Sequence, residues 1–184
     1  LQAKDDPQKL KVVYNTLLGE LWEDRGEVDD PEEVAKRAEA YDAELPEGVL
    51  VLTCGVDTQD DRLEYEIVGH GRWDEKWGIK KGVILGRPDG DDVWLALDEV
   101  IDREYTYRDG RKLKISVTFV DSGGHFAQDV YYQCWLRMGK KVFAIKGKGG
   151  DGIAYTKVPT KIEIVVNGHK RKTWIYVLGV DAGK

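Results

Sequence analysis

The stretch VLVLTCGVD, residues 49–57, decides the fold of this chain. It is a near-continuous apolar run of the length of one strand, which is typical of a strand buried on both faces of a sheet. The run ends on a carboxylate, Asp57, and the polar TQDDR segment after it predicts a turn. Because a buried strand tolerates an acid only at its end or beside a partner, we expect Asp57 at the rim of the sheet.

Further strands follow this first one along the chain. LEYEIVGHG alternates apolar and acidic residues, as a half-exposed antiparallel strand does. The Asn167-Gly168 pair between two late apolar segments is typical of a β-hairpin. In all, strands are predicted at residues 49–57, 63–71, 77–85, 114–120, 142–146, 161–166 and 172–178.

Two helices interrupt these strands. The first covers residues 93–101 and has Asp91 or Asp92 as its expected cap. The second covers residues 126–138, where apolar side chains recur at four-residue spacing on one face. The order of elements predicts an α/β fold with a mixed five-stranded sheet flanked by helices, plus a late β-hairpin. That order matches the ribonuclease H-like fold.

The first 45 residues differ from the rest of the chain. They are rich in charge and predict one amphipathic helix over residues 7–21 and a second from Asp30, with Pro31 at its first position. Leu45 and Pro46 then break the helical pattern. We therefore expect a helical segment over residues 1–45 and one main domain over residues 46–184.

Composition sets limits on the function. The net charge of -6 argues against an overall basic nucleic-acid clamp, but acidic clusters are what hard divalent cations need. No apolar run approaches the roughly 18 residues of a membrane span, and the N-terminus lacks a secretory pattern, so we expect a soluble intracellular protein. Cys54 and Cys134 have no metal-site spacing and are expected to be buried thiols.

A second carboxylate repeats the position of the first. Asp121 ends the strand VTFVD and is followed by Ser122, Gly123 and Gly124. If the two strands are neighbours, the carboxylates of Asp57 and Asp121 converge, and a divalent cation would relieve their repulsion. The alternative is that each is an ordinary turn residue at a strand end.

Other candidates have weaker patterns. Asp181 follows the last strand and is either a third metal ligand or a helix cap, and Glu66 is the reserve ligand. Lys146 ends a strand, where it would neutralise a phosphate or simply face water. The remaining candidates are DNA-backbone contacts near basic or glycine-rich turns, namely Lys148, Lys170, Arg171 and Lys172.

Several motifs argue against other chemistry. The three histidines, His70, His125 and His169, lack ligand spacing, although His125 follows the Asp121 turn. KGKGGDG, residues 146–152, lacks the spacing of a phosphate loop and does not lead into a helix. We therefore expect no ATPase site in this chain.

Taken together, the motifs resemble the C-terminal nuclease half of the large terminase subunit of tailed phages, in the lambda-type, GpA-like family. The matching stretches span nearly the whole chain in the family's order. They are YNTLLGELWED, LPEGVLVLTCGVDTQDDRLEYEIVGHG, VWLALDEVID, FVDSGGH, VFAIKG and LGVDAGK. One departure is His70, which stands where an aromatic residue is expected.

The resemblance implies a nuclease that cuts concatemeric double-stranded DNA during packaging, in the cytoplasm of a bacterial host. Such proteins carry a separate ATPase motor, which residues 1–45 would join to this domain, and they act with a small terminase subunit and the portal. The acidic cluster of the family maps onto Asp57, Asp121 and Asp181.

The mechanism implied is two-metal phosphodiester hydrolysis with Mg²⁺ or Mn²⁺. Asp57 would bridge the two ions, Asp121 and Asp181 would each favour one, and Lys146 would assist the phosphate. Two alternatives stay open at this point. One is another ribonuclease H-like enzyme, such as a recombination nuclease or transposase core, and the other is a catalytically silent docking domain of the packaging motor.

Overall fold

The computed structural model describes residues 32, 35, 36, 38, 40–150 and 152–183. The helix predicted over residues 7–21 lies outside the described residues, as does most of the helix predicted from Asp30. Chain contacts divide the protein into two compact units, Leu1–Ala40 and Tyr41–Lys184. The second unit contains the sheet and is described below.

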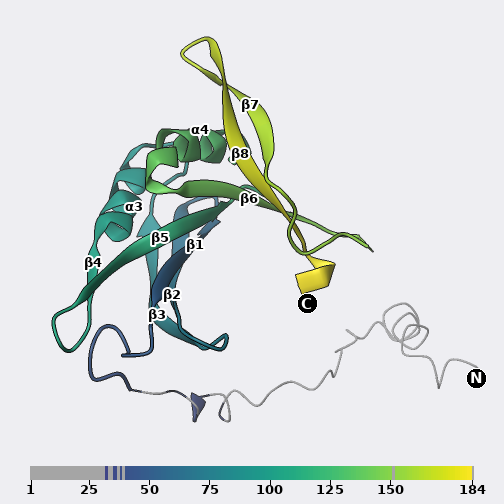
Figure 1. The fold of residues 1–184 in the computed structure, drawn as a ribbon. Helices are drawn as coiled ribbons and strands as arrows, with labels where there is room; N and C mark the ends of the chain where they lie inside the picture. The colour runs from purple at the N-terminus through teal and green to yellow at the C-terminus, as the bar shows by residue number, and fades with distance from the viewer. Residues whose placement is uncertain (1–31, 33–34, 37, 39, 151, 184) are drawn as a thin grey trace, which may run out of the picture. The chain divides into compact units, whose positions relative to one another are not determined.

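In the described part of the chain, eight strands form one sheet in the order β3-β2-β1-β5-β6-β8-β7, with β4 paired to β5 outside this path. β1, β5, β6 and β8 are parallel neighbours, and the other strands join them antiparallel (Figure 1). The strands are β1 Val51–Thr58, β2 Arg62–His70, β3 Lys76–Leu85, β4 Glu104–Thr106, β5 Lys112–Asp121, β6 Val142–Lys148, β7 Thr160–Val166 and β8 His169–Gly179.

The predicted fold class is confirmed. β3, β2, β1, β5 and β6 form the expected mixed five-stranded core, and the whole is compatible with the ribonuclease H-like fold. The late hairpin is also confirmed, with Asn167 and Gly168 at positive φ in its turn. It extends the same sheet through parallel pairing of β6 with β8, and it projects past the helices in Figure 1.

The two helices predicted in this unit are found as α3 Asp92–Asp102 and α4 Ala127–Leu136. They lie together on one side of the sheet (Figure 1). Alternate strand residues point into this layer and are buried, among them Cys54 and Val56 on β1 and Val120 on β5. Their neighbours on the opposite face, such as Gly55 and Asp57, are exposed. Strand alternation therefore places Asp57 on the face of the sheet that the helices leave uncovered.

Contacts between α3 and α4 fix the helical layer. Asp91 precedes α3 but makes no side-chain cap hydrogen bond; its carboxylate instead accepts a 2.9 Å hydrogen bond from the Gln133 amide of α4. Arg137, only 8% exposed, donates to Asp98 at 2.8 and 3.0 Å. The predicted capping role of Asp91 is therefore replaced by a link between helices.

The two cysteines are buried free thiols, as predicted. Burial raises the pKa of Cys54 to about 12, and it raises the pKa of Cys134 to about 12 as well. None of the described helices combines the length and the apolar character that crossing a membrane requires.

Candidate active site

Asp57 and Asp121 end two neighbouring parallel strands at the same edge of the sheet. Val56 of β1 pairs with Val120 of β5, so the two aspartates follow at equivalent positions. The Thr58 hydroxyl donates a 2.9 Å hydrogen bond to the backbone carbonyl of Asp121, which ties the two strand ends together. The two strands are thus neighbours, which is the condition that the sequence sets for the two carboxylates to converge.

The strand register extends this pair into a row across the sheet. Asp57 pairs with Glu64 of β2, and Glu64 pairs with Val83 of β3. On the other side, Asp121 pairs with Ile145 of β6. Adjacent strands lie about 4.8 Å apart, so the three carboxylates of Glu64, Asp57 and Asp121 are successive neighbours on one face. We call these three residues the acidic row.

An open cavity of about 470 Å³ lies over the acidic row. Glu66 joins the acidic row in its lining, and among the described residues that line it Lys81 is the only cation. The full lining comprises Gly55, Val56, Asp57, Glu64, Tyr65, Glu66, Lys81, Phe119, Asp121 and Ile145. The cavity therefore concentrates oxygen ligands and negative charge at the carboxyl ends of β1 and β5.

Each acid of the row accepts a hydrogen bond that orients it. The Gln59 amide donates to the Asp57 carboxylate, and Arg62 donates to Glu64 at 2.7 Å. The backbone N–H of Gly123 donates to Asp121 at 3.1 Å. A Cβ at position 123 would stand 3.2 Å from the Asp121 carboxylate, so glycine keeps that carboxylate uncrowded. These contacts leave carboxylate oxygens free to accept further partners.

Asp181 is placed differently from Asp57 and Asp121. It follows β8 in the short 3-10 helix Asp181–Gly183, and its carboxylate accepts a 2.7 Å hydrogen bond from the Gly150 backbone. β8 lies two strands beyond β5, which is about 10 Å across the sheet. Among the described residues, no three Asp, Glu, His or Cys side chains meet closely enough to hold a metal ion. The role of Asp181 as a ligand stays a prediction.

The basic candidates lie away from the cavity. Lys146 lies within β6, two residues before its end, but Ile145 is the residue of β6 that lines the cavity, and alternation turns Lys146 to the opposite face. Lys148 ends the same strand, and its carbonyl accepts the Val180 N–H at 3.1 Å.

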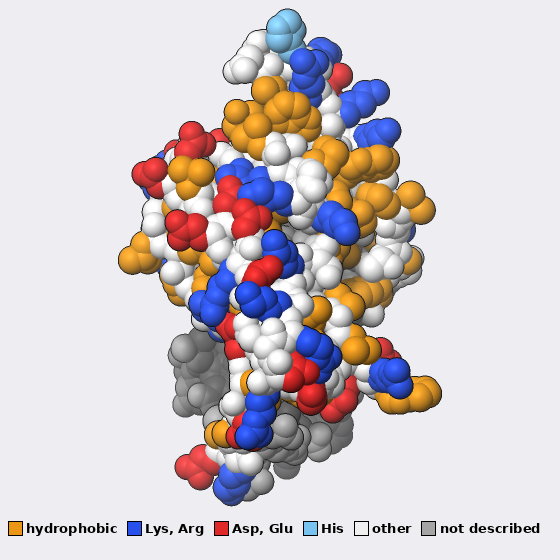
Figure 2. Space-filling model, turned by 60° about the vertical axis from the view of Figure 1, so that its left-hand side comes forward, with side chains coloured by type: hydrophobic (Ala, Val, Ile, Leu, Met, Phe, Trp, Pro, Cys, Tyr) orange, Lys and Arg blue, Asp and Glu red, His pale blue; other side chains and the backbone are white. Residues whose placement is uncertain are grey.

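The remaining basic candidates lie near the end of the β7–β8 hairpin. Lys170, Arg171 and Lys172 are exposed, and Figure 2 shows blue side chains gathered near the top of the molecule. Lys170 forms a 2.7 Å ion pair with Glu163. Their proposed contacts with DNA stay predictions.

The histidines have ordinary partners. His70 hydrogen bonds the Thr53 hydroxyl at 2.8 Å, and the exposed His125 lies 3.4 Å from Asp60. His169 is exposed at the start of β8. None of the three lines the cavity over the acidic row.

Sequence reasoning missed two charged residues of the cavity, Glu64 and Lys81. Alternation in β2 shows that Glu64 and Glu66 share a face, but it does not show which of them stands opposite Asp57. That choice depends on the register between β1 and β2, which pairs Asp57 with Glu64 and Gly55 with Glu66. Lys81 comes from the edge strand β3, and the register between β2 and β3 shifts between Ile67 and Val68. The partner of Lys81 could therefore not be read from the spacing of residues.

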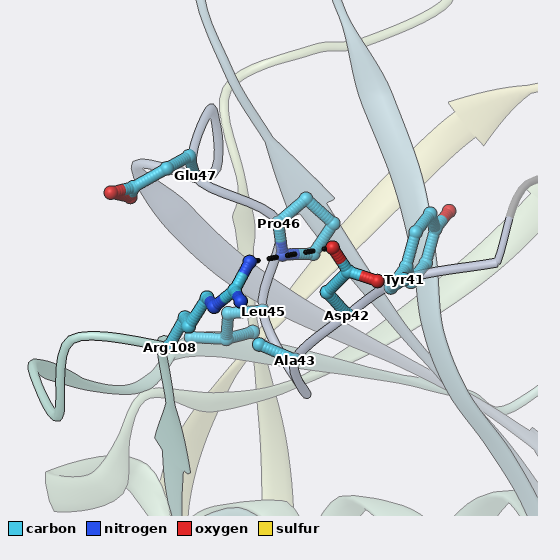
Figure 3. A pocket seen from close by; sticks show the side chains of 7 residues that line it. All are labelled: Tyr41, Asp42, Ala43, Leu45, Pro46, Glu47 and Arg108. Atoms are coloured by element: carbon cyan, nitrogen blue, oxygen red, sulfur yellow. Dashed lines mark hydrogen bonds and ion pairs between the residues drawn. The ribbon is translucent and has the colours of Figure 1, made fainter.

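A second cavity, of about 240 Å³, lies where the chain enters this unit (Figure 3). Its polar contact is an exposed 3.5 Å ion pair between Asp42 and Arg108. Leu45 in its wall is only 1% exposed and pairs with Tyr107. The cavity is a by-product of this packing and carries no constellation of reactive groups. Leu45 itself belongs to the core of the unit.

The fold and the acidic cavity define an α/β domain of ribonuclease H-like architecture with paired aspartates at adjacent strand ends. Comparison with known protein families identifies the family of this domain. The model of the endonuclease domain of the terminase large subunit gpA matches residues 1–184, and the chain belongs to this family.

Two curated relatives support this family membership. The chain is 35% identical to the terminase large subunit of Escherichia phage lambda and 31% identical to that of Enterobacteria phage P21, in each case over 185 aligned residues. Each alignment covers 100% of this chain and 28% of the relative, so the chain spans well under a third of those proteins. No solved structure matches the chain.

Proposed function

We propose that this domain is a metal-dependent endodeoxyribonuclease that cuts double-stranded DNA through the acidic row. The observation that supports the proposal is the placement of Asp57 and Asp121 at the ends of adjacent parallel strands in one cavity. Membership of a terminase endonuclease family gives the reaction class.

The donor set of the cavity fits a hard divalent cation. Glu64, Asp57 and Asp121 offer carboxylate oxygens, which Mg²⁺ and Mn²⁺ prefer. When bound, one or two such ions would supply charge neutralisation at the phosphate and a water of lowered pKa. Asp57, at the centre of the row, would contact the metal together with Asp121, and Glu64, Glu66 or Asp181 would complete the set.

The chain's own residues would prepare this site. Gln59 holds the Asp57 carboxylate, and the Thr58 bond fixes the spacing of β1 and β5. Lys81 would bind a non-bridging oxygen of the scissile phosphate, since it is the cation that faces the cavity. Lys146, Lys148 and the hairpin residues Lys170, Arg171 and Lys172 would contact the DNA backbone outside the cavity.

We extend the proposal to the whole protein through the resemblance of its motifs to the lambda-type terminase family. A terminase large subunit would use this domain to cut concatemeric phage DNA in the host cytoplasm, together with an ATPase motor, a small terminase subunit and the portal. The segment 1–45 would join the domain to the motor.

Plasmid nicking in Mn²⁺ tests the proposal. We expect Asp57→Asn and Asp121→Asn to lower the nicking rate at least about 100-fold, because each removes a charge that the reaction needs. Asp109→Asn is the matched control, since Asp109 lies on the exposed β4–β5 turn and contacts Arg111. Full activity in either site variant would refute the assignment.

Lys81 and Lys80 provide a second pair for the same assay. They are adjacent and both exposed, but only Lys81 lines the cavity. Lys81→Gln should slow nicking about tenfold or more, while Lys80→Gln should leave it unchanged. Equal effects of the two variants would show that only general charge matters.

Two further measurements separate the alternatives. A ribonuclease H-like recombination enzyme would cut four-way junctions in preference to linear duplex. A silent docking domain would gain no thermal stability from Mn²⁺, whereas a bound ion stabilises the folded state by mass action.

A further inference from the structure

A second row of side chains runs beside the acidic row on the same face of the sheet. Phe119 of β5 pairs with Phe143 of β6, and Lys161 of β7 pairs with Trp174 of β8. Phe143 and Trp174 stand at equivalent positions of adjacent parallel strands, because the residues after them, Ala144 and Ile175, are partners. We call Phe119, Phe143, Trp174 and Tyr176 the aromatic patch.

Three rings of the patch, those of Phe119, Phe143 and Tyr176, contact one another. Tyr176 lies 5.4 Å from Phe119 in an edge-to-face arrangement at 77°, and 5.5 Å from Phe143 at 58°. Phe119 and Phe143 are 6.2 Å apart at 39°. None of these three pairs is a parallel stack, so no ring face is covered in full by another ring of the patch. All four side chains are only partly buried, although large aromatic residues usually gain stability from full burial.

The patch is continuous with the cavity of the acidic row. Phe119 lines that cavity and stands two residues before Asp121 on β5, about 7 Å along the strand. Ile145, the partner of Asp121, pairs in turn with Tyr176. A molecule held at the acidic row would therefore reach the rings with its adjoining part.

Lysines lie at both ends of the face that carries the patch. Lys81 pairs with Glu66 on one side, and on the other side the Lys161 ammonium lies 4.6 Å from the centre of the Trp174 ring. Positive charge beside exposed rings is the combination that proteins use to hold unpaired nucleic acid, with phosphates on the cations and bases on the rings.

From this juxtaposition we propose that the aromatic patch stacks the bases of a locally unpaired DNA strand whose phosphate occupies the acidic row. The inference rests on the proposed nuclease function and names the state of its substrate. In an intact duplex the ring faces of the bases are stacked on one another, so only bases that have left the helix can stack on Phe119, Phe143 or Tyr176. The domain would thus cut a strand that has been opened at the site.

The test measures binding without cleavage. The 184-residue chain is titrated in EDTA at low salt against a fluorescein-labelled single-stranded oligonucleotide and against a duplex, and fluorescence anisotropy is recorded. We expect tighter binding to the single strand. Phe143→Leu and Tyr176→Leu keep apolar volume but lose the ring, and each should weaken single-strand binding about tenfold without changing duplex binding.

A control variant and a second readout keep the result specific. Trp73→Leu removes an aromatic side chain that is 96% exposed at the β2–β3 turn, away from the patch, and should leave binding unchanged. Single strands that carry 2-aminopurine should lose fluorescence on binding to the unmodified chain, because stacking quenches the base. Circular dichroism checks that each leucine variant is folded.

The outcomes separate this inference from the nuclease proposal. Unchanged single-strand binding in folded Phe143→Leu and Tyr176→Leu, or equal weakening by Trp73→Leu, would overturn base stacking. Nicking that survives Asp57→Asn would overturn the proposed active site but would leave the metal-free binding result standing.

Discussion

At the scale of single residues, Gly55 keeps the cavity open between the two rows. It lies on β1 between Glu66 of β2 and Phe119 of β5, and it is exposed on the uncovered face. A Cβ added there would meet no atom within 4 Å. Glycine is therefore not required by packing at this position, although it weakens a strand by about 0.5–1 kcal/mol relative to a residue with a side chain.

Gly55→Val should therefore separate stability from activity. The β-branched side chain suits a strand and has free space, so we expect the midpoint of thermal unfolding to stay the same or rise. The same side chain would stand in the cavity beside Asp57 and obstruct the substrate, so plasmid nicking should fall about tenfold or more. Nicking at the unmodified rate would show that substrate does not pass over this position.

Asp57 and Asp121 could be predicted from the sequence, whereas the charged residues beside them in the cavity could not. Asp57 and Asp121 each end an apolar run, and that position is visible without a structure. Glu64 and Lys81 reach the cavity only through pairing with other strands, which is a long-range property. Lys146 shows the opposite case, because it is expected at a strand end but lies within β6, where alternation turns it away from the cavity.

At the scale of elements, an ion pair between the partly buried Asp98 of α3 and the buried Arg137 joins α3 to the C-terminal end of α4. Asp98 accepts hydrogen bonds from Arg137 at 2.8 and 3.0 Å and from Lys140 at 2.9 Å. Burial alone would raise the pKa of Asp98, but the bonds from Arg137 and Lys140 outweigh it and hold that pKa below its ordinary value. The contact between α3 and the end of α4 thus depends on the ionised carboxylate of Asp98.

Asp98→Asn should destabilise the domain by about 2 kcal/mol, because Arg137 would stay buried without its counter-charge. A lowered pKa stabilises the fold above the ordinary aspartate pKa of about 3.9, and this stability is lost as the pH falls through the folded-state value. The unmodified protein should therefore lose more stability than the variant in that acidic range. Urea unfolding at neutral and acidic pH measures both effects.

Asp102→Asn is the control for this experiment. Asp102 also contacts Lys140, at 2.7 Å, but its side chain is 57% exposed and has solvent as an alternative partner. Exposed ion pairs contribute little, so its unfolding free energy should change by less than about 0.5 kcal/mol. A loss as large as that of Asp98→Asn would contradict the role given to burial.

Element prediction succeeded where the pattern was local. The strands and the two described helices were recognised from periodicity, and the hairpin from its Asn-Gly turn. β4 was missed because its three residues, Glu104–Thr106, are too few to show alternation. The joining of β8 to β6 was missed because no local pattern records which sheet edge a hairpin extends.

At the scale of the whole molecule, the two cysteines report on global unfolding. Cys54 lies on the central strand β1 and Cys134 on α4, each 1% exposed. Since burial raises the pKa of each thiol to about 12, almost no thiolate exists at pH values near 8. Their reactivity requires opening of the layer between sheet and helices.

Both thiols should therefore react with Ellman's reagent only when the domain unfolds. We expect slow labelling in buffer and a steep rise in guanidinium that coincides with loss of circular dichroism, with two thiols titrated in the denatured chain. Rapid labelling of one cysteine under native conditions would instead reveal a local opening of β1 or α4.

The alternation that sorts the strand residues also restricts how the gene for such a domain can change in length. Removing one codon between Leu52 and Asp57 would put Asp57 on the same face as Leu52, and therefore in the helical layer if Leu52 stays in the core. Viable insertions and deletions are thus expected in the turns between strands, or in even steps within them. The spacing of residues along one short strand thus keeps the core residues and the acidic row on opposite faces of the sheet.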